Sequence, residues 1–244
     1  MAPTQGTFQR YEKKYLLSEL QYRQIKAAWK DKFEIDQYKE TTICNIYFDT
    51  PSHLLIRNSL EKPIYKEKLR LRSYGTPSEG DTVFVELKKK YKGVVYKRRV
   101  KMELSQAEKF LYEREKIESS TQIVKEIDYF LDFYKELIPS MYISYDRTAY
   151  YGLDNPDLRI TFDTNVRYRE EKLWLEAGVW GDRLLEDGTK LMEIKIPGAM
   201  PVWLSNTLTD LNIYPTSFSK YGRAYEISLK KPKTIIKEGE IKYA

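Results

Sequence analysis

The chain has 244 residues, of which 41% are hydrophobic and 32% charged, and its 21 tyrosines are far more than a disordered chain carries. These numbers exclude an intrinsically disordered chain and predict a folded protein with a sizeable core. The formal net charge of +6 favours anionic partners, which include phosphates, nucleic acid and acidic membrane surfaces.

The first half of the chain predicts one helix among several strands. Residues 8–17 are typical of a strand and residues 17–33 of a helix, in which Ser18 and Gln21 have the spacing of a capping box. Further strands are predicted at 41–50, 65–75, 81–90 and 93–104, with turn-like segments at 51–55, 75–81 and 91–93 between them. Strands that follow one another so closely favour antiparallel pairing.

The second half adds helices and three strands. A helical block begins at Ser105, where Ser105 and Glu108 match a capping box, and continues over 120–137 until Pro139 ends it. Strands are predicted at 140–152, 158–169 and 191–198, followed by a helix at 201–214 with Pro201 in its first turn. We expect an α+β fold, a β-rich barrel with helices packed outside, as a single domain over residues 1–230 with a flexible basic tail over 231–244.

The sequence contains one cysteine and one histidine, which leaves few residues for catalysis or metal binding by these side chains. Cys44 is the single cysteine, and its neighbours Ile43 and Ile46 predict a buried structural thiol. The single histidine, His53, lies in a turn-like stretch, which argues against a histidine zinc cluster or catalytic triad. No stretch is long and apolar enough to span a bilayer and no secretory signal is recognised, so we expect a cytoplasmic location.

The positive charge falls on one face of the predicted strands. Residues two apart on a strand share a face, so one face carries Lys66, Lys68, Arg70 and Arg72, whereas Leu69 and Leu71 lie on the other. Four further strands show the same division, with basic faces that carry Lys88, Lys90, Lys97, Arg99, Lys101, Arg159 and Lys195. The acids on these faces are few, namely Glu86, Asp163 and Glu193. An ordinary exposed sheet face would intersperse acids and bases, because like charges across a strand pair repel. We therefore favour a phosphate-binding face.

Eight segments follow one another as in a known family. In chain order, RYEKKYLL, YKEKLRLRSYG, VFVELKKK, YKRRV, SYDRTAYYG, LRITFDT, LMEIKIPG and SFSKYGRAY resemble the VTC domain of polyphosphate polymerases, a branch of the triphosphate tunnel metalloenzymes. The resemblance runs from about Arg10 to Leu229. It implies an antiparallel β-barrel tunnel with outer helices and an enzyme that transfers the γ-phosphate of ATP to a growing inorganic polyphosphate chain. It also implies Mn²⁺ or Mg²⁺ as cofactor.

The same resemblance assigns roles to residues of the basic faces. It implies Arg70, Arg72, Lys88, Arg147 and Lys195 as catalytic cations, Lys14, Lys97, Arg159 and Lys220 as phosphate-binding cations, and Glu193 as the metal ligand. Lys66, Lys68, Lys90, Arg99 and Lys101 are expected at the tunnel mouths or on the outer rim. Structural alternatives stay open, because Arg147 could pair with Asp146 or Asp163, and Lys220 could cap the helix that precedes it.

The chain departs from the hydrolytic members of the wider superfamily, which usually carry a Glu-x-Glu-x-Lys strand near the amino terminus. Arg10, Glu12 and Lys14 stand at these positions here, and an arginine in place of the first acid weakens a two-metal hydrolase interpretation. Glu12 and Glu86 could be second metal ligands or salt-bridge partners, and the structural role is favoured.

Three functions other than synthesis are compatible with a basic tunnel or a basic sheet face. A triphosphatase or polyphosphatase of the same fold and a non-catalytic polyphosphate-binding module are the main alternatives. Nucleic-acid binding is disfavoured, because the basic strands carry mainly aliphatic side chains on their opposite faces rather than exposed aromatics for base stacking. ATP and polyphosphate are therefore the expected partners. The resemblance also implies a membrane-protein partner that receives the product, which would place the chain at the inner face of a membrane.

Overall fold

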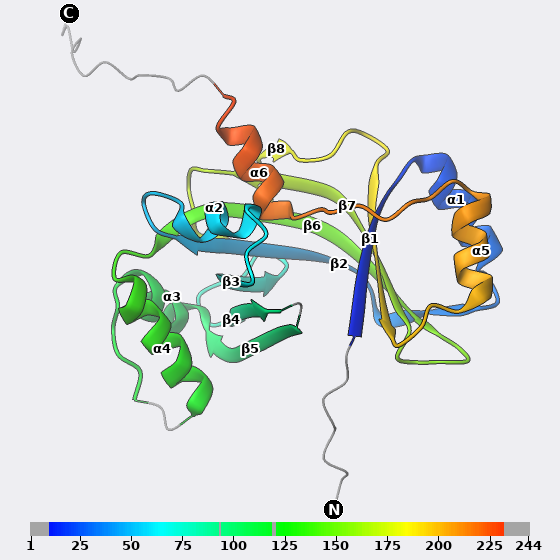
Figure 1. Cartoon of the computed structure of the whole chain (residues 1–244). Helices are drawn as coiled ribbons and strands as arrows, with labels where there is room; N and C mark the ends of the chain where they lie inside the picture. Colours follow the sequence, from blue (N-terminus) through cyan, green and yellow to red (C-terminus); the bar gives the residue numbers. More distant parts are fainter. Residues whose placement is uncertain (1–9, 93, 119–120, 232–244) are drawn as a thin grey trace, which may run out of the picture.

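A computed structural model describes residues 10–92, 94–118 and 121–231 (Figure 1). The strands are β1 (Arg10–Leu17), β2 (Phe33–Asp49), β3 (Tyr65–Tyr74), β4 (Thr82–Tyr91), β5 (Val94–Glu103), β6 (Ile138–Gly152), β7 (Arg159–Arg169), β8 (Asp182–Arg183) and β9 (Lys190–Pro197). The helices are α1 (Glu19–Ala28), α2 (Leu54–Leu60), α3 (Leu104–Tyr112), α4 (Gln122–Tyr134), α5 (Val202–Asp210) and α6 (Lys220–Ser228), with a 3₁₀ turn η1 at Leu175–Ala177. The predicted tail lies, from residue 232 on, outside the described residues.

One antiparallel sheet contains all of these strands. Its order is β1-β9-β7-β6-β2-β3-β4-β5, with β8 paired to β7, and β1 and β5 are the edges of the described sheet. The sheet therefore curls without hydrogen-bonding into a closed barrel. Strands far apart in this order nevertheless face one another across the curled sheet. Lys14 on β1 is close enough to Lys68 on β3 and Lys88 on β4 to lower the pKa values of both. The α+β tunnel fold predicted from the sequence is confirmed.

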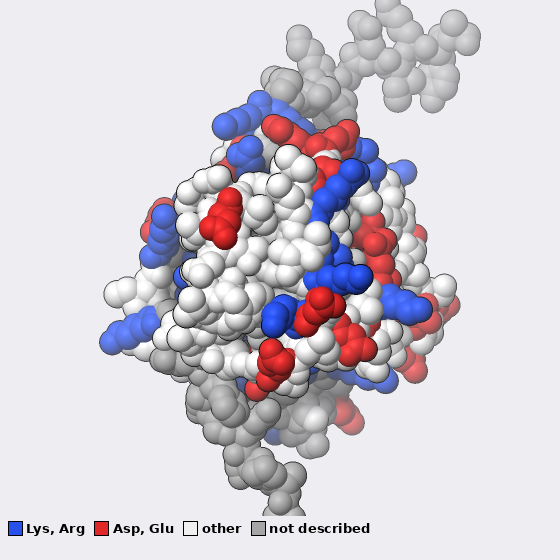
Figure 2. Space-filling model, turned by 90° about the vertical axis from the view of Figure 1, so that its right-hand side faces the viewer, with Lys and Arg blue, Asp and Glu red and all other residues white. Residues whose placement is uncertain are grey.

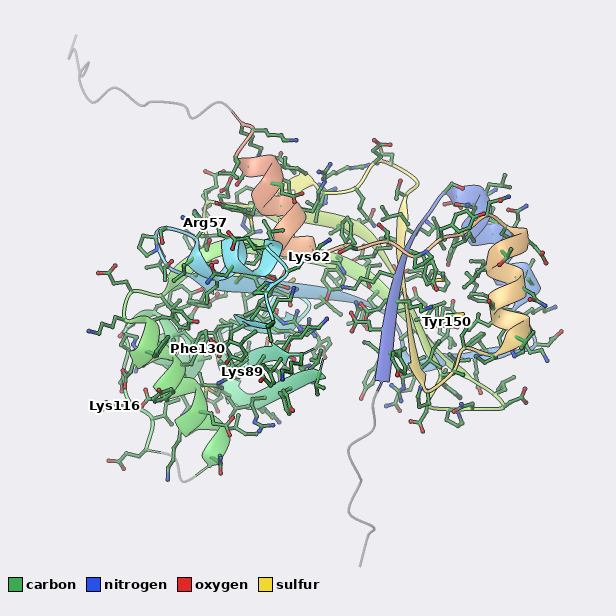
Figure 3. The ribbon with its side chains drawn as sticks, in the orientation of Figure 1. Arg57, Lys62, Lys89, Lys116, Phe130 and Tyr150 are labelled. Carbon is green, nitrogen blue, oxygen red and sulfur yellow. The ribbon has the colours of Figure 1, made fainter. Side chains whose placement is uncertain are left out.

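The outer face of the sheet carries the aliphatic residues that the alternation predicted. Helices α3 and α4 cover β3 to β5, where Leu69, Leu87 and Val85 are fully buried against Phe110 and Ile127. Each such buried side chain contributes roughly 1.5–3 kcal/mol. Figure 3 shows Phe130 of α4 and Lys89 of β4 at the junction between this helix and the sheet. Helices α1 and α5 lie together at the other side of the molecule (Figure 1), over β7 and β9.

Two helices that the sequence did not predict, α2 and α6, pack on the inner side of the sheet. The expected turn at 51–55 runs into α2, because the buried carboxylate of Asp49 accepts hydrogen bonds from the backbone N–H groups of Leu55 at 2.8 Å and Ile56 at 2.9 Å. Tyr221 of α6 donates to the same carboxylate at 2.9 Å, and its ring stacks on Tyr47 with centroids 4.7 Å apart. Helix α6 thus approaches the basic face directly.

Several predicted boundaries are confirmed and others are wrong. The capping box of Ser18 with Gln21 is present, and Cys44 is buried as expected. The capping box at Ser105 is wrong, since α3 begins at Leu104, directly where β5 ends, with no side-chain cap. Pro139 does not end α4, which stops at Tyr134; the proline lies within β6. None of the helices in the described ranges is long and apolar enough to cross a membrane.

Candidate functional site

Lysines occupy directly paired positions on three neighbouring strands. Lys68 on β3 lies opposite Lys88 on β4, which lies opposite Lys97 on β5. Burial is the main cause that lowers the pKa of Lys68 to about 8; Tyr47 opposes this shift, and the ammonium groups of Lys88, Lys66 and Lys14 add to it. Burial is also the main cause that lowers the pKa values of Lys88 and Lys97. Like charges so close together destabilise a sheet, so this arrangement favours a bound anion.

Lys88 combines exposure with a lowered pKa. Its side chain is accessible to water, yet burial lowers its pKa, and its charged neighbours Glu12, Lys14, Arg70 and Glu193 come from several strands. The two observations agree, because a side chain in a water-filled tunnel is surrounded by protein atoms without being sealed off. None of the described residues forms an ion pair or hydrogen bond with the Lys88 ammonium. This cation is therefore available to a ligand.

The carboxylate of Glu86 organises the arginines on the inner face of β3 to β5. Glu86 is 1% exposed and lies 2.6 Å from Arg70, 2.7 Å from Lys97, 3.1 Å from Arg99 and 3.7 Å from Arg72. Burial raises the pKa of Glu86, but Arg70, Arg72 and Lys97 outweigh burial and hold it at about 2. Glu86 thus has the salt-bridge role that the sequence favoured.

A second buried carboxylate, Asp163 on β7, joins β6 to α6. Arg147 donates two hydrogen bonds to it at 2.6 and 2.8 Å, and Lys220 donates one at 2.5 Å. Of the two structural pairings left open for Arg147, the one with Asp163 is present. The alternative that Lys220 caps a preceding helix is wrong, because Lys220 is the first residue of α6 and points at Asp163.

Replacing Asp163 by asparagine is expected to lower the free energy of unfolding by about 3–5 kcal/mol, because the half-buried cations Arg147 and Lys220 lose the buried anion that they share. The matched control is Asp182→Asn, which removes an exposed ion pair with Lys231 and should change stability by less than about 1 kcal/mol. Urea unfolding of the two variants measures the difference. A loss in Asp163→Asn no larger than in the control would contradict the assigned pairing.

Tyr145 lies among these cations and was not singled out in the sequence. The Lys220 ammonium lies 4.2 Å and the Arg147 guanidinium 5.1 Å from the centroid of its ring. Burial raises the pKa of Tyr145, but Arg147, Arg72 and Lys220 together lower it to about 8. Its place two residues before Arg147 on the same strand face was the signal that could have identified it.

Glu193 on β9 fits the metal ligand that the resemblance implies. It is 8% exposed, pairs with Lys195 at 2.8 Å and lies opposite Lys14 and Thr161 in the sheet. Burial raises the pKa of Glu193, but Lys195, Lys14 and Arg147 lower it well below its usual range, so the carboxylate is ionised. The buried hydroxyl of Thr161 has no hydrogen-bond partner among the described residues. Divalent ions in phosphate-transfer sites are commonly held by one or two carboxylates together with substrate phosphates, and this donor set is compatible with that pattern. The described residues contain no cluster of three or more His, Cys, Asp or Glu side chains.

The remaining predicted residues lie around this interior. The Lys14 ammonium donates to the carbonyl of Phe218 at 3.0 Å and lies 3.3 Å from Glu12. Arg159 is opposite Lys195, but its side chain is 55% exposed and lies 3.8 Å from Asp36, which places it at a tunnel mouth. Lys68, expected at a mouth or rim, instead points inward and donates to the Ser219 hydroxyl at 3.0 Å.

The outer surface looks different from this interior. Figure 2 shows the molecule from the side of α1 and α5, where uncharged atoms fill most of the centre and side chains of both signs mix along the margins. In the part of this face that the structure describes, acids and bases are interspersed, whereas the inner strand faces gather cations around Glu86, Asp163 and Glu193. The interior is therefore the strongest candidate for an anion site.

An antiparallel sheet curled around such an interior defines the triphosphate tunnel fold. A putative adenylate cyclase from Bacillus halodurans shares it at a TM-score of 0.53 and 13% identity, over 85% of this chain and 92% of that chain. A putative adenylyl cyclase from Hippeastrum, described as having a dominant triphosphatase activity, shares it at a TM-score of 0.54 and 16% identity, over 92% of this chain and 98% of that chain. A search of curated proteins found no match. The VTC domain model matches residues 9–229, and the chain belongs to the VTC domain family.

Proposed function

We propose that the chain is a metal-dependent polyphosphate polymerase, which transfers the γ-phosphate of ATP to a growing polyphosphate chain inside the tunnel. The observation that carries this proposal is the convergence of cations from β1, β3, β4, β5, β6 and α6 on one interior whose buried acids are already shared among them. Membership of the VTC domain family supports it. The partners in this proposal are ATP, inorganic polyphosphate and a membrane protein that takes the product, the last supported by the sequence resemblance alone.

The cations divide into two roles in this proposal. Arg70 and Arg72 are held in place by Glu86, and their planar guanidinium groups can donate two hydrogen bonds to one phosphate. Lys88 offers a point charge on a flexible stem, and no acid in the described ranges forms an ion pair with it. Catalytic contacts are assigned to Arg70, Arg72, Lys88, Arg147 and Lys195, and further phosphate contacts to Lys14, Lys97, Arg159 and Lys220. A mixture of arginines and lysines suits a polyphosphate chain that must be bound and yet move along the tunnel as it grows.

The transfer itself requires no protein nucleophile. A terminal oxygen of the polyphosphate chain attacks the γ-phosphorus of ATP, the bond to the β–γ bridging oxygen breaks, and ADP leaves with that oxygen. The protein contributes position and charge, since the arginines and lysines neutralise the phosphate oxygens and align donor and acceptor. When bound at Glu193, Mn²⁺ or Mg²⁺ would neutralise further phosphate charge and favour departure of ADP.

Hydrolysis is the second candidate function, because the Hippeastrum protein of the same fold is described as a triphosphatase. The same cradle could then hold a triphosphate for attack by water. The amino-terminal strand favours transfer, since Arg10 stands where hydrolytic members of the superfamily have their first acid, and Glu12 is paired with Lys14 at 3.3 Å.

Product analysis separates these functions. The purified chain is incubated with ATP and Mn²⁺, with a parallel reaction in EDTA, and the products are resolved on a polyacrylamide gel while ADP is measured by chromatography. Long phosphate chains that appear together with ADP in the Mn²⁺ reaction are expected. Free phosphate without chains would replace synthesis by hydrolysis, and retained polyphosphate binding without ATP turnover would favour a binding module.

Anion binding is expected to take up protons near pH 8 to 9. The pKa of Lys68 is lowered to about 8 in the free protein, and a bound phosphate chain favours the charged ammonium and raises it again. Binding therefore adds a proton, and the affinity for tripolyphosphate falls as the pH rises above about 8. Calorimetric titration at pH 8.5 in two buffers of different ionisation enthalpy measures this uptake. Lys68→Arg, which stays charged, should take up fewer protons; equal uptake in both proteins would contradict the role of Lys68.

A further inference from the structure

Towards one end of the tunnel, the inner faces of β3 and β4 carry aromatic side chains in place of cations. Beyond Arg72 on β3 lies Tyr74, and the residue opposite Arg72 on β4 is Phe84 rather than a cation. Arg99 on β5 joins these two rings. Tyr74, Phe84 and Arg99 are named the mouth cluster below.

Contacts within the mouth cluster hold it in a defined geometry. The Arg99 guanidinium lies 3.7 Å from the centroid of the Phe84 ring, and its Nη2 donates to the Tyr74 hydroxyl at 2.8 Å. The rings of Tyr74 and Phe84 meet edge to face, with centroids 5.7 Å apart and planes at 80°. The Nε atom of Arg99 lies 3.1 Å from Glu86. The cluster is therefore arranged before any ligand arrives.

The exposure of Tyr74 shows that the cluster is more than core packing. Tyr74 is 50% exposed and Arg99 is 33% exposed, so a planar surface remains open to solvent beside an ordered guanidinium. Aromatic rings and arginine planes of this kind stack on the faces of nucleobases, whatever the base.

The position of the mouth cluster connects it to the phosphate cations. Glu86 forms an ion pair with Arg99 through Oε1 and with Arg70 through Oε2, so one side chain separates the aromatic surface from the cations assigned to phosphate. At the opposite ends of the same three strands, the inner-face positions are Lys66, Lys90 and Val95, which suit a phosphate chain and offer no ring for a base.

We propose that the mouth cluster binds the nucleobase of the nucleoside triphosphate whose phosphates lie at Arg70 and Arg72. The nucleotide then enters the tunnel from the Tyr74 end. This inference rests on the proposed function, because it takes a nucleoside triphosphate as the phosphate donor.

The test compares two ligands that share a triphosphate and differ in the nucleoside. Affinities for ATP and for inorganic tripolyphosphate are measured by calorimetry on the wild-type chain, Tyr74→Ala and Tyr74→Phe. The matched control is Tyr91→Ala, since Tyr91 is a tyrosine of similar exposure, 46%, at the end of β4 away from the cluster. Tyr74→Ala should weaken ATP binding about tenfold through the loss of stacking and leave tripolyphosphate binding within about twofold. Tyr74→Phe keeps the ring and should bind ATP nearly as the wild type does.

The outcomes separate this inference from the proposed function. A Tyr74→Ala variant that loses ATP and tripolyphosphate affinity equally, or loses neither, overturns the nucleobase site while the wild-type chain can still make polyphosphate. Loss of ATP affinity in Tyr91→Ala equal to that in Tyr74→Ala also overturns it. A wild-type chain that binds neither ligand overturns the proposed function and this inference with it.

Discussion

Replacing Glu193 by glutamine is expected to lower the rate of polyphosphate formation from ATP by at least about 10²-fold. The substitution keeps the size of the side chain and removes the charge that a divalent ion requires, and a bound metal contributes several kcal/mol of charge stabilisation in phosphoryl transfer. The fold should persist, because glutamine has the same size and, among the described residues, the ion pair of Glu193 joins it to Lys195 on its own strand at 2.8 Å rather than to a distant element. The rate is measured from the initial appearance of polyphosphate at saturating ATP and Mn²⁺.

The control for this variant is Glu126→Gln, which removes a carboxylate of α4 that pairs with Arg98 at 2.7 Å on the outer side of the sheet. Its rate should equal that of the wild type. Binding of Mn²⁺ in the presence of tripolyphosphate gives a second readout, which should weaken in Glu193→Gln alone. A wild-type rate in Glu193→Gln would remove Glu193 as the metal ligand.

Replacing Lys88 by methionine should reduce the rate of polyphosphate formation from ATP by about 10²-fold or more. Thermal stability is measured on the same variant. Methionine retains most of the aliphatic stem and deletes the ammonium, which has no ion-pair partner among the described residues. Removing a single preorganised charge from a transition state typically costs about 10²–10³ in rate. Because burial, with a smaller contribution from Lys14 and Arg70, lowers the pKa of Lys88 despite the opposing effect of Glu12, the charged ammonium is disfavoured and thermal stability should stay equal or rise.

This combination of lost activity and retained stability distinguishes a ligand-binding cation from a structural one. The control Lys125→Met changes an exposed lysine of α4 and should alter neither quantity. A Lys88→Met protein that unfolds at a clearly lower temperature, or that makes polyphosphate at the wild-type rate, would contradict the assigned role.

The buried acids explain how an interior this basic folds without a ligand. Glu86 and Asp163 each bind two or more cations and orient their side chains before phosphate arrives. Breaking such buried pairs is costly, so these acids are positioning residues. Lys88 has no ion-pair partner among the described residues, so its charge is available to a ligand.

The strand faces could be predicted from the sequence because alternation is a local rule. Leu69 and Leu71 are fully buried under the helices, and Arg70 and Arg72 face the interior as predicted. The neighbours that each side chain meets could not be predicted in this way, because they depend on register between distant strands. The pairing of Glu86 with Arg70 on one side and Arg99 on the other appears only once β3, β4 and β5 are aligned.

Long-range contacts also explain the missed elements. Helix α2 is short, and its start is fixed by Asp49, which in turn bonds Tyr221 on α6, 172 residues further along the chain. No local pattern contains that information. The expectation that Lys68 lies at a tunnel mouth was wrong for the same reason. Its side chain points inward to Ser219 at the start of α6, a contact between distant parts of the chain.

The most direct test of the account is a crystal structure of the chain soaked with tripolyphosphate. A phosphate chain is expected inside the tunnel, with oxygens in contact with Arg70, Arg72 and Lys88. Tripolyphosphate bound only on the outer surface, with the interior cations untouched, would contradict it.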